Sequence, residues 1–230
     1  MVDEKIIQST KENLEWIFTF APELQKHFID RREEVKKQFP KLEPKDVRIT
    51  SFGYYLQHIR TIQLVANSFY QGIDKSSNAQ ENNDFILSER LFRFSFFLNV
   101  FSSFESTIRI LMRQMLMEEY YKNPVVPTFI KQKLGVLTFT DSFELARLLR
   151  NTVHNNGFYF PDREKGKHVT IDYKQQQFTF EDGKAIEILS WPLTFSLAED
   201  FGYLLKDIFS SEKVVKIDSI VDPLVNYEKL

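Results

Sequence analysis

The strongest constraint on the fold is one long segment that carries apolar side chains on nearly every side of a helix. Between residues 91 and 117, Phe, Leu, Ile and Met recur without leaving a polar face, and such a helix must be covered by other helices or by a membrane. Pro124 and Pro127 end the pattern, because proline lacks an amide donor. We predict a helix over residues 85–121, on the order of 55 Å long, as the centre of a helical bundle.

A membrane is an unfavourable environment for this segment. Residues 91–112 contain Arg93, Glu105 and Arg109, and each charge at bilayer depth costs a few kcal/mol. The first residues, from Met1 onward, also lack the basic start and apolar run of a signal peptide. We therefore expect a cytoplasmic (cytosolic) protein.

Apolar residues recur at helical spacing in three other long segments, which are residues 3–39, 51–71 and 193–210. Pro22 predicts a break at residues 20–21, with a second helix after it, because proline is tolerated in the first turn of a helix but not in its interior. The polar, turn-rich residues 72–84 predict a loop. The predicted core residues of the second segment are Leu56, Ile59, Leu64 and Phe69.

After Pro161 apolar and polar residues alternate, which is the pattern of half-buried strands. This alternation predicts a three-stranded antiparallel meander over about residues 168–189. A four-residue loop at residues 174–177, and a three-residue loop at Asp182-Gly183, place the apolar side chains on one face. The predicted pairs are Tyr173 with Phe178, Ile171 with Phe180, Phe180 with Ile186, and Phe178 with Ile188.

The expected fold is a mainly α, multi-helix bundle around a long central helix, with a small antiparallel β-meander insertion near the C-terminus, in a single domain over residues 1–230. The 7 Gly and 8 Pro are too few for an all-β sandwich dense in turns. The absence of Cys excludes disulfides, thiolate zinc sites, iron–sulfur clusters and cysteine nucleophiles. With 30 Lys and Arg against 32 Asp and Glu, the chain has no overall basic field, so binding of RNA or phosphate requires a local patch.

One local patch is predicted on a short helix over residues 141–154. At about 100° per residue, Arg147, Arg150, Asn151 and His154 fall within an arc of about 100°, while most apolar residues fall on the other side. An arginine guanidinium is suited to bidentate contact with phosphate. A histidine imidazole can move a proton near neutral pH. These four residues, defined here as the polar stripe, are the candidate functional residues of the chain.

The polar stripe also has a purely structural explanation. Arginine and histidine near the C-terminus of a helix often cap its last carbonyls or pair with carboxylates of a neighbouring helix. Glu105 and Arg109 of the long helix, four residues apart, are likewise either a half-buried ion pair or a supporting pair beside the stripe. His27 and Asp30 could share a metal, but a third ligand is not evident, so we predict that they pair at the surface.

The sequence Leu148-Leu-Arg-Asn-Thr-Val-His-Asn-Asn-Gly resembles the signature of the HEPN superfamily (higher eukaryote and prokaryote nucleotide-binding domains). These are compact helical domains, many of them metal-independent ribonucleases. Their motif is an arginine, four to six intervening residues and a histidine, often with a polar residue directly after the arginine. Arg147 fits that spacing to His154, whereas Arg150-Asn151 supplies the arginine–polar pair but leaves only three residues before the histidine.

The resemblance covers about residues 85–157, including the segment Phe104-Glu-Ser-Thr-Ile-Arg109. It implies that His154 assists attack of an RNA ribose 2′-OH on the adjacent phosphate, and that Arg147 or Arg150 stabilises the charge that develops there. It further implies a homodimer in which two motifs face one cleft, and neither a metal nor a cofactor. A toxin or phage-defence role, with an antitoxin or other protein partner, belongs to the same expectation.

A second interpretation keeps the helical fold without catalysis. In it the polar stripe or a Phe-rich surface binds a nucleotide or a protein partner. Cleavage of RNA in EDTA, and its loss when His154 is replaced, distinguishes the two interpretations.

Overall fold

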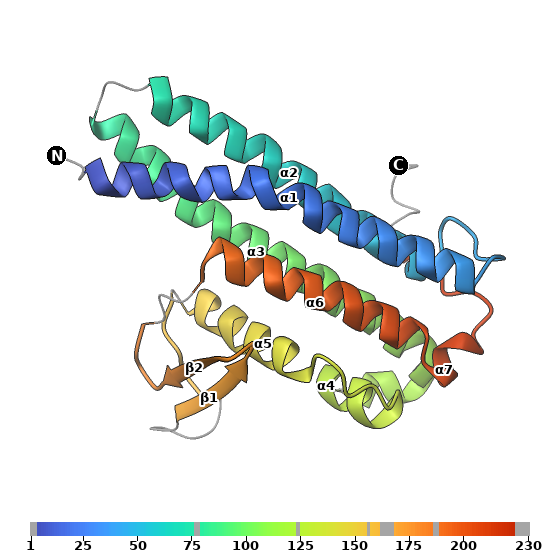
Figure 1. Cartoon of the computed structure of the whole chain (residues 1–230). Helices are drawn as coiled ribbons and strands as arrows, with labels where there is room; N and C mark the ends of the chain where they lie inside the picture. The colour runs from blue at the N-terminus through green and yellow to red at the C-terminus, as the bar shows by residue number, and fades with distance from the viewer. Residues whose placement is uncertain are drawn as a thin grey trace.

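The computed structural model describes residues 4–75, 79–122, 125–155, 157–161, 168–185 and 189–223. In chain order its elements are α1 (Glu4–Gln38), α2 (Val47–Lys75), α3 (Ala79–Leu116), the 3-10 helix η1 (Met117–Lys122), α4 (Val126–Thr128), the π-helix η2 (Phe129–Lys133), α5 (Thr140–His154), β1 (His168–Tyr173), β2 (Gln176–Glu181), α6 (Trp191–Phe209) and α7 (Glu212–Val215). The long helices run side by side, and the two strands lie beside α5 (Figure 1). In the described part of the chain, every helix is too short or too polar to cross a lipid bilayer.

The long helix α3 forms the centre of the bundle, which confirms the predicted fold class. It packs against α1, α2, α5 and α6. Phe104 stacks on Phe201 of α6 with ring centroids 4.7 Å apart, and Phe101 stacks on Phe143 of α5 at 5.7 Å. All four rings are buried. Aromatic contacts between α3, α5 and α6 therefore fix the position of α5, the helix that carries the polar stripe.

The helix α1 is continuous through Pro22, so the predicted break at residues 20–21 is wrong. Ile17, Ala21 and Leu24 belong to one buried stripe that passes the proline without a change of phase. Both halves of α1 therefore pack on the same neighbours, α2 and α6. Pro22 itself is exposed, where water can replace the missing amide donor. Burial of the stripe thus outweighs the local cost of the proline.

The predicted loop over residues 72–84 is also wrong at both ends. The helix α2 continues to Lys75 and α3 begins at Ala79, and only residues 76–78 lie outside the described residues. A Cβ at Gly72 would lie 2.4 Å from the ring of Phe85, so the missing side chain lets the two helices approach closely. One predicted core residue of α2, Leu64, is 72% exposed, and that prediction is wrong as well.

The sheet near the C-terminus is an antiparallel hairpin of β1 and β2. Tyr173 pairs with Gln176, so the loop has two residues, and the predicted four-residue loop is wrong. Lys174 and Gln175 both have positive φ, 45° and 66°, which gives a turn whose twist matches that of the strands. The register differs from the prediction by two residues, so each side chain still points to the predicted face.

The third strand of the predicted meander lies mostly outside the described residues, which stop at Ala185 and resume at residue 189. Ala185 itself forms an isolated antiparallel bridge with Phe158. The N–H of Tyr159 donates to the carbonyl of Lys184 at 3.1 Å. The chain after β2 therefore returns to the segment that follows α5.

A buried ion pair holds the C-terminal segment against the start of α2. The side chains of Arg48 and Asp46 are fully buried and lie 2.7 Å apart, from Nη2 to Oδ2. Arg48 also donates to the carbonyls of Ile217 and Asp218, and the N–H of Ile220 donates to Asp46. Each buried charge thus has several partners, as a charge away from water requires. We define this arrangement as the C-terminal clasp.

His27 of α1 packs against α6 and is not paired with Asp30 at the surface as predicted. A Cβ at Gly202 of α6 would lie 2.4 Å from Nε2 of His27. This ring nitrogen is buried without a hydrogen-bond partner among the described residues. Asp30 instead accepts a hydrogen bond from Lys26 at 2.5 Å. Burial, with a smaller contribution from the positive charge of Arg31, lowers the pKa of His27 from 6.5 to about 4.

This lowered pKa predicts a loss of stability in mild acid. Below about pH 6.5 the unfolded chain takes up a proton at His27, which the folded protein accepts only near pH 4, so the free energy of unfolding falls between these values. Because solvent reaches part of the ring, we discount the shift and expect about 1–2 kcal/mol. Urea unfolding of the wild type and of His27→Gln at several pH values measures this. Parallel stability curves of the two proteins would contradict the assignment.

Candidate functional site

The helix α5 packs with one face and presents the polar stripe on the other. Its buried residues are Ser142, Phe143, Leu145, Ala146, Leu148, Leu149 and Thr152. Arg147, Arg150 and Asn151 are half-buried, and His154, the last residue of the helix, is exposed. Helical spacing in the sequence therefore predicted the two faces of α5 correctly.

Three of the four stripe residues line an open groove of about 380 Å³ between α3, α5 and the start of α4. The lining residues are Phe101, Glu105, Arg109, Val125, Val126, Pro127, Phe143, Arg147, Arg150 and Asn151. The walls are apolar at Phe101, Phe143 and residues 125–127, and polar groups converge from α3 and α5. Glu105 and Arg109 form the partly buried ion pair that was one of the two predicted alternatives, and this pair lines the groove beside the stripe.

Two of the three guanidiniums in the groove are already paired with carboxylates. Arg109 donates to Glu105 from Nε at 3.0 Å and from Nη2 at 2.5 Å, and this hydrogen bonding raises the pKa of Arg109 above its usual value. Arg147 donates to Glu144, three residues earlier on α5, at 3.0 and 2.6 Å. Both side chains of that second pair are about one-third exposed. Such pairs add little to stability, but they cancel most of the charge of the two arginines.

Among the residues that the structure describes, Arg150 is the guanidinium of the groove without a carboxylate partner. Its Nη1 donates to Oδ1 of Asn151 at 3.2 Å, and no carboxylate of a described residue lies within ion-pair distance of it. A planar guanidinium can bind an anion with two parallel hydrogen bonds. Asn151 adds a side-chain amide donor beside it.

His154 lies on the same face of α5 as Arg150 and Asn151, one turn nearer the end of the helix, and it does not line the groove. Its side chain is exposed. The structure therefore does not bring the imidazole into the groove that Arg147, Arg150 and Asn151 line. An extended ligand that filled the groove and continued along α5 would reach the imidazole.

The sequence reasoning missed one wall of the groove and the carboxylate that pairs with Arg147. Pro124 and Pro127 were interpreted only as the end of the long helix, whereas residues 125–127 form a wall of the groove. Glu144 was not singled out, although its three-residue spacing from Arg147 is the spacing of a helical ion pair and could have identified it.

No protein-family model, curated protein or solved structure matches the chain. Among the residues that the structure describes, no three His, Asp or Glu side chains gather as a metal site would require.

Proposed function

We propose that this chain is a HEPN-like, metal-independent endoribonuclease that binds RNA along the polar stripe of α5. The observation that carries the proposal is Arg150, an arginine without a carboxylate partner among the described residues. It lines an open groove and lies four residues before the exposed His154 on α5. The groove, about 380 Å³ in volume, has room for a phosphate group and its sugar. The apolar wall at residues 125–127 gives the rest of a nucleotide a surface to pack on.

In the proposed reaction, His154 accepts the proton of a ribose 2′-OH while the 2′ oxygen attacks the adjacent phosphorus. The bond from phosphorus to the 5′ oxygen breaks, this oxygen takes up a proton, and the products are a 2′,3′-cyclic phosphate and a 5′-OH. Arg150 stabilises the negative charge that develops on the phosphate oxygens. Arg147 has the spacing to His154 that the motif asks for and Arg150 departs from it. We assign the role to Arg150 all the same, because Arg147 is paired with Glu144.

A homodimer is part of the proposal, because the resemblance pairs two motifs across one cleft and the position of His154 outside the groove fits a cleft completed by a second copy. A role as a toxin or phage-defence component, with an antitoxin as protein partner, follows from the same resemblance.

A second candidate is a non-catalytic module that binds a nucleotide or a protein partner. The specific observation in its favour is that Arg109 and Arg147 are both held by carboxylates, so that one guanidinium remains for anion binding. Such a module would bind phosphate at Arg150 and leave it intact.

Replacement of Arg150 with glutamine tests both candidates. We expect single-stranded RNA to bind about tenfold or more weakly, because a charge-assisted contact to phosphate is lost. The slope of log affinity against log salt should become shallower by about 0.7. Fluorescence anisotropy with labelled RNA, at several salt concentrations, measures both quantities.

The matched control is Arg60→Gln, which removes an exposed arginine from α2, outside the groove. Equal RNA affinity of Arg150→Gln and the wild type would contradict the ribonuclease and the nucleotide-binding form of the second candidate. Incubation of the wild type with RNA in EDTA then separates them: appearance of 2′,3′-cyclic phosphate ends supports the ribonuclease, and intact RNA supports the binding module.

A further inference from the structure

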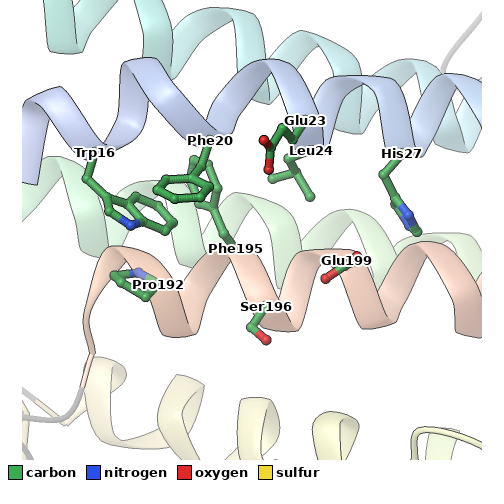
Figure 2. Close-up of a pocket in the computed structure, with 9 residues that line it drawn as sticks. All are labelled: Trp16, Phe20, Glu23, Leu24, His27, Pro192, Phe195, Ser196 and Glu199. Carbon is green, nitrogen blue, oxygen red and sulfur yellow. The ribbon is translucent and has the colours of Figure 1, made fainter.

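A second groove, of about 250 Å³, lies between α1 and α6, outside the polar stripe. It is lined by Trp16, Phe20, Glu23, Leu24, His27, Pro192, Phe195, Ser196 and Glu199. Figure 2 shows Trp16 and Pro192 at one end, His27 at the other, and the carboxylates of Glu23 and Glu199 on opposite walls between them. One end of the groove is thus aromatic and its middle is acidic.

The aromatic end of the groove is formed by three side chains whose rings contact one another. The ring of Trp16 stacks on Phe20 with centroids 4.4 Å apart and meets Phe195 edge-on at 4.9 Å. Phe195 is buried, whereas Phe20 is 37% exposed. An exposed aromatic face attracts cations through its quadrupole as well as apolar groups through burial.

The two carboxylates of the groove are not paired with a cation of any residue that the structure describes. Neither Glu23 nor Glu199 forms an ion pair or a side-chain hydrogen bond with a described residue. His27, with its lowered pKa, is uncharged at neutral pH.

The nearest cations on the adjoining turns are occupied elsewhere. Lys26 pairs with Asp30 and Arg31 pairs with Glu34. Lys174, which donates to Ser196 at the edge of the groove, forms an ion pair with Asp200. The groove therefore keeps a net negative charge next to aromatic rings.

We propose that the α1–α6 groove is a binding site for a small organic cation, an ammonium group carried on an aromatic or aliphatic body. The body packs on Trp16, Phe20 and Phe195, and the ammonium group lies between Glu23 and Glu199, where charge-assisted hydrogen bonds hold it. The volume lies just below the range of about 300–1,000 Å³ usual for ligand pockets, which selects a small ligand. This site is independent of the ribonuclease proposal.

The test uses 2-phenylethylamine, which is protonated at neutral pH, and its neutral analogue 2-phenylethanol. Isothermal titration of the full chain, with each compound up to roughly 10 mM, measures both affinities. We expect the amine to bind about tenfold or more tightly than the alcohol. In the double variant Glu23→Gln/Glu199→Gln this preference should disappear, whereas Glu12→Gln, which changes an exposed carboxylate of α1 outside the groove, should keep it.

Three results would overturn the proposal: no binding of the amine, equal affinity for amine and alcohol, or an unchanged preference in the double variant. Quenching of tryptophan fluorescence by the bound amine shows, in addition, whether the amine lies next to Trp16. Trp16 lines the groove and Trp191, the other tryptophan, is buried. Quenching should therefore persist in Trp191→Phe and vanish in Trp16→Leu, and binding without any effect of Trp16→Leu would place the ligand elsewhere.

Discussion

Replacement of His154 with glutamine is expected to slow RNA cleavage by about 10²–10⁴-fold, the usual contribution of a general acid–base group. RNA affinity should stay nearly unchanged, because His154 lies outside the groove that binds the phosphate. Glutamine retains polar hydrogen-bonding groups at this exposed position but cannot accept the proton of the 2′-OH at neutral pH. Single-turnover cleavage with excess enzyme separates the chemical step from binding.

The matched control for this prediction is His168→Gln. His168 is also exposed and opens β1, outside the groove, so its replacement should leave cleavage intact. Cleavage at the wild-type rate in His154→Gln would remove the proposed chemistry from this residue.

The second large effect is expected in the C-terminal clasp. Arg48→Met should lower the free energy of unfolding by about 3–5 kcal/mol, because it leaves the buried carboxylate of Asp46 without its cation. This is a substantial fraction of the 5–15 kcal/mol that typically separates folded from unfolded chains. Urea unfolding followed by circular dichroism measures the change.

The matched control is Lys216→Met, which breaks an exposed ion pair with Glu212. A surface pair contributes about 0–1 kcal/mol, so this variant should remain close to the wild type. If both variants lost the same small amount, the buried pair would contribute no more than a surface pair, and the clasp would not be a major source of stability.

Helical periodicity predicted the central parts of the fold, because burial of apolar side chains against neighbours dominates there. The long helix, α5 and α6 are all close to their predicted positions. The errors occur where a local signal competes with packing. A proline normally ends a helix, yet the buried stripe of α1 continues past Pro22. The hairpin turn has Lys174-Gln175 in place of the usual Asn-Gly, so its two-residue loop had no sequence signal.

For the candidate site, the residue spacing of an α-helix was enough to place Arg147, Arg150 and Asn151 on a common face. It could not show that residues 125–127 complete a groove, because that wall comes from another segment. It also could not show which arginine stays available. That distinction depends on side-chain pairing, with Glu144 holding Arg147 and no carboxylate of a described residue holding Arg150.

The C-terminal clasp has a consequence for biosynthesis. The N–H of Val47 donates to the carbonyl of Ile220, and the N–H of Asp222 to that of Lys45, so the first turn of α2 is completed by residues made much later. A ribosome adds about 5–20 residues per second and releases the N-terminal part first. The hydrogen bonds that join the start of α2 to residues 220–222 can therefore form only after those residues have left the ribosome.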